Sequence, residues 1–175
     1  MNDRSADARV RNVLFLCTGN SARSIIAEAL LNRAGAGRFR AFSAGSDPKP
    51  APHPMALEIL AELEFPLDGL RAKSWQEFAA PDAPTMDLVI TVCDSAAGEI
   101  CPVWPGRPAM AHWGIEDPAA VEGAGQREAF LTALRYLRNR IALLVNLPDE
   151  GLDELQWRDR VRSIGKIGEG TIGGG

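Results

Sequence analysis

Residues 10–24, VRNVLFLCTGNSARS, decide the fold of this chain. Residues 10–17 form a short apolar run that is typical of a buried strand. Residues 24–32, SIIAEALLN, have an apolar face and predict a helix that ends near Gly35. A loop that leads from a strand into a helix N-terminus points several backbone N–H groups at one concavity, which binds tetrahedral anions. The sequence therefore predicts an oxyanion site after the first strand.

Each residue type in this loop has a use at such a site. Gly19 and Asn20 tolerate the left-handed backbone of a tight turn, and the planar guanidinium of Arg23 donates to two oxyanion oxygens. Beside that cation and a helix N-terminus, the pKa of Cys17 is expected to fall well below about 8.5, which makes the thiol a nucleophile. Ser24 is expected to donate a hydrogen bond to the thiolate. The predicted oxyanion-binding residues are Thr18, Gly19, Asn20, Ser21, Ala22, Arg23 and Ser24.

A cysteine that merely ends a buried strand is the alternative interpretation of Cys17, because buried cysteine is common. The pair of Cys17 and Arg23 is a weak pattern by itself. The surroundings favour the anion site, because a strand precedes the loop, a helix follows it, and no proline or bulky side chain blocks it.

Strand and helix patterns alternate along the rest of the chain. Strands are predicted at residues 38–44, 88–93 and, more weakly, 108–113, and a helix is predicted from Pro54. A long amphipathic helix is predicted from its apolar positions, Phe130, Leu134, Leu137, Ile141 and Leu144. This alternation predicts a single-domain α/β fold, doubly wound around a mostly parallel sheet.

Composition limits the class of protein. The chain has 175 residues and a formal net charge of −4, which disfavours partners such as nucleic acid or anionic membranes. No apolar run approaches the length of a membrane span, and the N-terminus lacks a signal-peptide core, so a cytoplasmic protein is expected. Three cysteines argue against a structural disulfide framework, and neither His53 nor His112 has zinc-like spacing to them. We expect no metal and no cofactor.

The stretch VLFLCTGNSARSIIAEALL at residues 13–31 resembles the signature of the low-molecular-weight protein tyrosine phosphatase fold. Within that fold it is most similar to the arsenate reductases. The resemblance extends over about residues 10–146, through FSAG at 42–45, ITVCD at 90–94, CPVWPG at 101–106 and HWGIEDPA at 112–119. It implies a four-stranded parallel sheet flanked by helices, with the loop at the carboxyl end of the first strand.

The same resemblance divides the chain into three parts. A disordered N-terminal arm is expected at residues 1–9 and a phosphatase-like arsenate reductase domain at 10–150. A C-terminal extension with a flexible glycine-rich tail is expected at 151–175.

The resemblance also implies roles for side chains outside the loop. Asp117 matches the general acid of the family. From spacing alone a turn residue before Pro118 is the favoured interpretation, and the resemblance reverses that preference. Cys17, Cys93 and Cys101 match a thiol relay, in which Cys17 attacks arsenate, Cys93 attacks Cys17, and Cys101 then attacks Cys93. The final disulfide would be reduced by thioredoxin, by glutaredoxin or by a low-molecular-weight thiol.

For each of the two later thiols a simpler interpretation stays open. Cys93 is also a small hydrophobe at the end of a strand, and Cys101 is also a loop residue before Pro102. Two features differ from the relatives. Ala22 stands where many have a second cysteine, and the interval from Cys93 to Cys101 is one residue longer than in the thioredoxin-coupled reductases.

Three functions compete. The first is thiol-dependent reduction of arsenate to arsenite, with phosphate or sulfate as mimics of the substrate. The second is a phosphatase that hydrolyses phosphate monoesters through a phosphoenzyme at Cys17. The third is a non-catalytic oxyanion binder or redox sensor. The family's phosphatases carry tyrosines beside the acid, whereas the only tyrosine here, Tyr136, falls in the long helix. This favours the reductase, an oxidoreductase of arsenical resistance.

Overall fold

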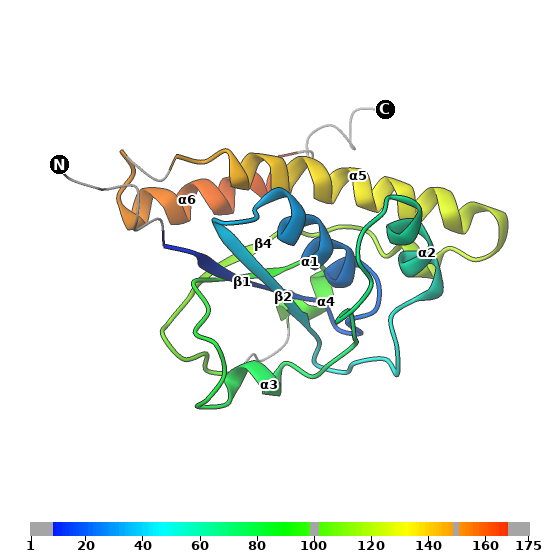
Figure 1. Cartoon of the computed structure of the whole chain (residues 1–175), viewed down its shortest axis with the longest axis horizontal. Helices are drawn as coiled ribbons and strands as arrows, with labels where there is room; N and C mark the ends of the chain where they lie inside the picture. Colours follow the sequence, from blue (N-terminus) through cyan, green and yellow to red (C-terminus); the bar gives the residue numbers. More distant parts are fainter. Residues whose placement is uncertain (1–8, 99–101, 149–150, 168–175) are drawn as a thin grey trace.

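The computed structural model describes residues 9–98, 102–148 and 151–167 of the chain, and Figure 1 shows their arrangement. Cys101, most of the expected N-terminal arm and the glycine-rich residues 168–175 lie outside these ranges. The elements in chain order are β1 (Arg11–Leu16), α1 (Arg23–Ala34), β2 (Phe39–Ala44), α2 (Pro54–Glu62), α3 (Gln76–Ala79), β3 (Leu88–Thr91), α4 (Asp94–Gly98), β4 (Ala109–His112), the 3-10 turns η2 (Pro118–Ala120) and η3 (Gly123–Gly125), α5 (Gln126–Val145) and α6 (Glu154–Ile164).

The four strands form one parallel sheet in the order β2-β1-β3-β4, which confirms the predicted α/β fold. β1 and β3 are neighbours, with Leu16 opposite Thr91 at their carboxyl ends. β3 is shorter than predicted and ends at Thr91, so Cys93 lies in the connection to α4 rather than in the strand. The segments that follow β1 and β3 therefore meet at one edge of the sheet.

Both faces of the sheet are covered. Val13 and Phe15 point to the face that packs against α1, α5 and α6, whereas Leu14 and Leu16 point to the opposite face. That second face is closed mainly by Trp75, at the start of α3. Figure 1 shows α5 and α6 along one side of the sheet and α3 on the other. Successive side chains of a strand point to opposite faces of the sheet, and both faces are covered. The strand sequences are therefore almost continuously apolar.

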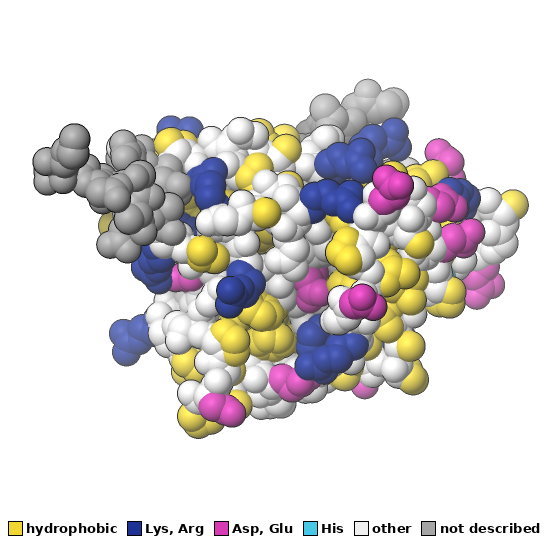
Figure 2. All heavy atoms as spheres, in the orientation of Figure 1, with side chains coloured by type: hydrophobic (Ala, Val, Ile, Leu, Met, Phe, Trp, Pro, Cys, Tyr) yellow, Lys and Arg dark blue, Asp and Glu magenta, His cyan; other side chains and the backbone are white. Residues whose placement is uncertain are grey.

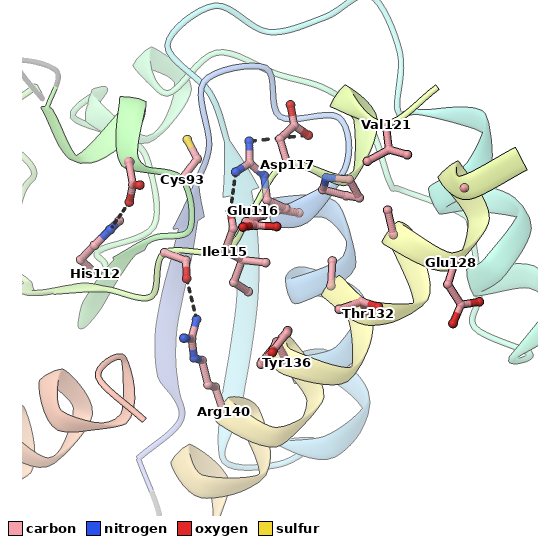
Figure 3. Close-up of a pocket in the computed structure, with 17 residues that line it drawn as sticks. Cys93, His112, Ile115, Glu116, Asp117, Val121, Glu128, Thr132, Tyr136 and Arg140 are labelled. Carbon is pink, nitrogen blue, oxygen red and sulfur yellow. Dashed lines mark hydrogen bonds and ion pairs between the residues drawn. The ribbon is translucent and has the colours of Figure 1, made fainter. Parts of the chain in front are cut away.

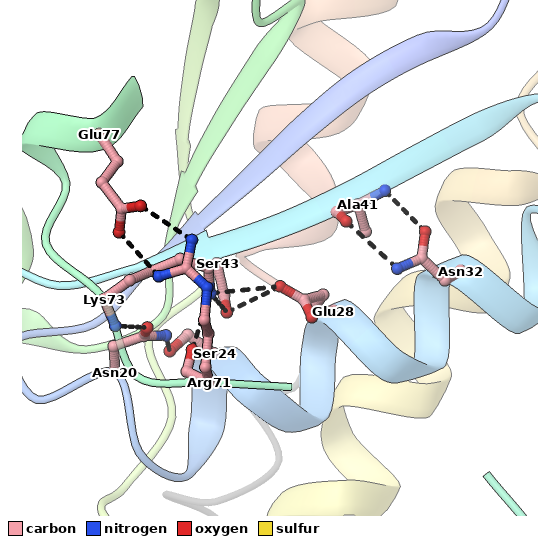
Figure 4. Close-up of polar contacts among 9 residues, drawn as sticks. All are labelled: Asn20, Ser24, Glu28, Asn32, Ala41, Ser43, Arg71, Lys73 and Glu77. Atoms are coloured by element: carbon pink, nitrogen blue, oxygen red, sulfur yellow. Dashed lines mark hydrogen bonds and ion pairs between the residues drawn. The ribbon is translucent and has the colours of Figure 1, made fainter. Parts of the chain in front are cut away.

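The free edge of β2 is closed by a side chain. The amide of Asn32, in α1, donates from Nδ2 to the Ala41 carbonyl at 3.2 Å and accepts the Ala41 N–H at 2.8 Å (Figure 4). Asn32 thus occupies both hydrogen-bonding groups of one residue in an edge strand, which hinders pairing with another chain.

The C-terminal extension contains a helix that the sequence analysis did not predict. α6 begins with a capping box between Asp153 and Gln156, and buries Trp157 and Val161. The indole Nε1 of Trp113 donates to the Val161 carbonyl at 3.2 Å, which ties α6 to the end of β4. The capping residues and the apolar spacing along residues 153–164 were the available signals.

Charged side chains of both signs lie on the surface of the molecule (Figure 2). Figure 2 shows one face of the molecule, on which basic and acidic side chains are interspersed. Among the described residues, no helix has the length and apolarity needed to cross a bilayer.

Candidate active site

Backbone hydrogen bonds from the segment after β2 hold the loop between β1 and α1. The carbonyl groups of Thr18, Gly19 and Ser21 accept hydrogen bonds from backbone N–H groups in residues 47–53, at 2.8–3.0 Å. Because the C=O and the next N–H of a peptide unit point in opposite directions, the N–H groups that follow these carbonyls face the other way, into the loop. A Cβ at Gly45 would lie 2.4 Å from the Thr18 carbonyl oxygen, so only glycine permits this approach.

Asn20 holds the turn of the loop. Its φ of 45° is in the left-handed region, which asparagine tolerates better than most residues. The buried side chain donates from Nδ2 to Ser24 Oγ at 2.8 Å and accepts the Lys73 N–H on Oδ1 at 2.9 Å. Asn20 therefore links the loop to the start of α1 and to the backbone of Lys73, which is the role of a structural support.

Arg23 is the first residue of α1, and one N–H group of its guanidinium has no hydrogen-bond partner. Its NH1 donates to the Ile115 carbonyl at 2.7 Å, and NH2 lies 3.8 Å from Asp117 Oδ1 (Figure 3). Its Nε is buried and has no hydrogen-bond partner. A buried unpartnered donor on a guanidinium is costly unless a ligand accepts from it, and an oxyanion supplies such an acceptor.

The structure brings Asp117 to the loop and also gives it a turn role. Its Oδ1 accepts the Ala119 N–H at 3.0 Å and caps η2, as the turn interpretation expected. The carboxylate is half exposed and faces Arg23. Both interpretations of Asp117 are therefore compatible, because the turn is what positions the carboxyl group at the mouth of the loop.

Cys17 and Cys93 form a buried, hydrogen-bonded pair of free thiols. The bond to Cys93 and burial raise the pKa of Cys17, although Arg23 acts in the opposite direction. The same bond lowers the pKa of Cys93 to about 5, with help from the N–H groups of Thr18 and Ala96, each 3.4 Å from its sulfur. The predicted fall in the pKa of Cys17 is therefore wrong for the free protein, because the bond to Cys93 and burial outweigh the effect of Arg23.

The hydrogen-bonded pair of Cys17 and Cys93 predicts how the thiols of the reduced protein titrate. At neutral pH we expect one thiolate in the reduced protein, which disappears with a midpoint near pH 5 as Cys93 is protonated. Thiolate ultraviolet absorbance and alkylation rates measure it. In Cys93→Ser, the group that raises the pKa of Cys17 is removed, so Cys17 should titrate at lower pH than it does in the parent. A single step near the ordinary value of about 8.5 in the parent would contradict the pairing.

Behind the loop lies a buried cluster of Glu28, Ser43 and Lys73 (Figure 4). Ser43 Oγ donates to Glu28 Oε1 at 3.0 Å, and Lys73 Nζ lies 3.8 Å from the same oxygen. Burial raises the pKa of Glu28 and lowers the pKa of Lys73, and each opposes that effect on the other. The sequence analysis missed Lys73, because no local pattern marks it. The described residues contain no cluster of metal-ligating side chains.

Replacing Lys73 by methionine should destabilise the fold. The buried Glu28 carboxylate would lose its cation, and breaking such a pair costs about 3 kcal/mol. Urea unfolding measures the change. Lys166→Met, at an exposed lysine, is the matched control and should be nearly neutral. Adding Glu28→Gln should recover part of the loss; an unchanged free energy of unfolding in Lys73→Met would contradict the assigned pair.

A cavity of about 900 Å³ opens beside the loop. Arg23, Cys93 and Asp117 lie at one end of it, and Tyr136 extends it along α5 (Figure 3). The sequence analysis did not foresee that Tyr136 lines this space, because its place in the long helix gave no signal of which face it occupies.

The fold and this loop define a class of protein. The family described as low molecular weight phosphotyrosine protein phosphatase matches residues 12–154, and the chain belongs to it. An arsenate reductase of Bacillus licheniformis is 32% identical over 127 residues, which are 71% of this chain and 87% of the relative. A solved structure titled "An arsenate reductase in the phosphate binding state" is 27% identical, with a TM-score of 0.64 over 77% of this chain and 96% of that one. The thioredoxin-dependent arsenate reductase of Corynebacterium glutamicum is 27% identical, with a TM-score of 0.56 over 79% of this chain and 61% of that one.

Proposed function

We propose that this protein is an arsenate reductase that uses Cys17 and Cys93 as its two electron donors. The observation that supports this most directly is the buried contact between the two free thiols, one in the anion loop and one directly after β3. Hydrolysis of a phosphate ester needs one nucleophilic thiol. A two-electron reduction needs two thiols that can form a disulfide.

The first step is attack on arsenate. Loop N–H groups and the unpartnered Nε of Arg23 bind the oxyanion. Cys17 gives up its proton, to Cys93 or to solvent, and its sulfur forms a bond to arsenic. One As–O bond breaks, and Asp117 protonates the departing oxygen, which leaves as water. The product is a covalent Cys17–arsenic adduct that is still As(V).

The second step is the reduction. Once any proton that Cys93 took from Cys17 has passed to solvent, the Cys93 thiolate attacks the sulfur of Cys17, so that an S–S bond forms and the S–As bond breaks. The electron pair of the broken bond stays on arsenic, which becomes As(III) and leaves as arsenite, while the two thiols are oxidised to a disulfide. The Thr18 and Ala96 N–H groups favour this step, because they stabilise Cys93 as a thiolate.

The disulfide must then be reduced for another turnover. In the proposed relay Cys101 attacks Cys93 and releases Cys17, and thioredoxin, glutaredoxin or a low-molecular-weight thiol reduces the Cys93–Cys101 disulfide. The name of the Corynebacterium relative favours thioredoxin. This cycle requires a reducing compartment, which supports a cytoplasmic location.

The decisive assay measures arsenite release from arsenate by the full-length parent protein, with thioredoxin and thioredoxin reductase or with glutaredoxin and glutathione. Aryl phosphate hydrolysis is measured beside it. Arsenite formation with either reductant supports the proposal. Hydrolysis without any arsenite would establish the phosphatase function instead, and oxyanion binding without either reaction would leave only a binder or sensor.

A further inference from the structure

A second polar network includes residues on both sides of Cys93 in the chain. Thr91 ends β3, His112 ends β4, and the two are opposite each other in the sheet register. Thr91 Oγ1 lies 2.7 Å from His112 Nδ1, and His112 Nε2 lies 2.8 Å from Asp94 Oδ1. Figure 3 draws the second of these contacts beside Cys93.

The chemistry of the three groups fixes the direction of the bonds. An ionised carboxylate only accepts, so His112 Nε2 donates to Asp94. In the neutral ring Nδ1 then accepts the hydroxyl proton of Thr91. One imidazole therefore holds the residue two positions before Cys93 and the residue directly after it.

Two glycines, Gly114 and Gly165, lie close to the residues of this network. A Cβ at Gly114 would lie 2.8 Å from both Asp94 Oδ1 and His112 Nε2. A Cβ at Gly165, after α6, would lie 2.1 Å from the His112 carbonyl oxygen. Real Cβ atoms do not approach other atoms so closely, so Gly114 leaves room for the imidazole and its partner, and Gly165 permits the close approach of the end of α6 to the His112 backbone.

We infer that His112 and Asp94 are positioning residues for Cys93, which hold the start of α4 so that the Cys93 sulfur faces Thr18 and Cys17. This inference rests on the proposed function, since it assigns the two residues to the disulfide-forming step. The sulfur depends on that placement, because its N–H donors come from both sides: Thr18 from the loop and Ala96 from α4. A shift of α4 would separate Cys93 from Cys17, and displacement of a reacting group by about 1 Å can slow a reaction about 100-fold.

Asp94→Ala is the informative variant, because the Asp94 side chain is 95% exposed and its removal leaves no buried cavity. Its surface pair with His112 adds little to stability. We expect urea unfolding, the KM for arsenate and aryl phosphate hydrolysis to stay close to the parent values. Single-turnover arsenite release should fall about 10- to 100-fold. A residue with only a structural role would not separate these readouts.

Asp94→Asn and Asp82→Ala complete the set. Asp94→Asn keeps an oxygen that accepts from His112 Nε2, so it should restore most of the rate. Asp82→Ala removes an exposed aspartate in the loop before β3 and should stay within about twofold of the parent.

The second measurement does not depend on arsenate. In a Cys101→Ser background, the equilibrium between the reduced protein and the Cys17–Cys93 disulfide is measured against reduced and oxidised dithiothreitol. Asp94→Ala should lower the disulfide fraction, because the effective concentration of one thiol at the other falls. An unchanged equilibrium and an unchanged arsenite rate would overturn the inference. If the parent releases no arsenite but Asp94→Ala still shifts this equilibrium, the proposed function fails and the positioning role stands.

Discussion

Cys17→Ser is expected to abolish both arsenite release and aryl phosphate hydrolysis, each by more than about 10⁴-fold. Both reactions begin with a bond between the Cys17 sulfur and the central atom of the oxyanion. A serine hydroxyl in the same place stays protonated at neutral pH and is a far weaker nucleophile. Steady-state rates with arsenate and with an aryl phosphate measure the loss.

Binding provides the control for this variant. The loop N–H groups and Arg23 remain, so sulfate or arsenate should still raise the thermal unfolding midpoint of Cys17→Ser. Loss of activity with retained binding assigns Cys17 to chemistry. Residual activity of a few per cent in either reaction would contradict its role as the nucleophile.

Cys93→Ser is expected to separate the two reactions. Arsenite release should fall at least about 1000-fold, because the substitution removes the thiol that contacts Cys17 among the described residues. Aryl phosphate hydrolysis should persist. The bond and the charge of Cys93 raise the pKa of Cys17, so their removal favours the Cys17 thiolate, which Arg23 then stabilises.

Cys101→Ser is the matched comparison for Cys93→Ser. With Cys93 present, it should release about one equivalent of arsenite per protein and then stop as the Cys17–Cys93 disulfide. A burst in Cys101→Ser and none in Cys93→Ser would place Cys93 in the reducing step. Multiple turnover by Cys93→Ser at the parent rate would refute the relay.

The local parts of the site could be predicted because their causes are local. The apolar run before Cys17, the turn residues Gly19 and Asn20, and the apolar start of α1 follow one another in the chain. Strand, loop and helix form from neighbouring residues, so the position of Arg23 at the start of α1 follows from them. The alternation of strands and helices can also be seen in the local sequence, and it predicted the parallel sheet.

The features that the sequence analysis predicted wrongly or missed depend on contacts between residues far apart in the chain. Lys73 reaches Glu28 only because the chain after β2 returns to the loop. α6 has its own capping box, but it is short and depends on packing against Trp113 and the end of β4, which lie elsewhere in the chain. The fall in the pKa of Cys17 was predicted from its own loop, whereas the thiol of Cys93, which follows β3, reversed the direction of the shift.

The amino-acid sequence predicted an anion loop with Cys17 and Arg23 on a parallel α/β sheet. Only the tertiary structure decided that β3 lies beside β1, so that Cys93 and its network with His112 and Asp94 meet the loop. A thiol's charge depends on every donor, cation and apolar group within a few ångströms. Those neighbours are set by the pairing of strands distant in the chain, which the sequence of the loop does not contain.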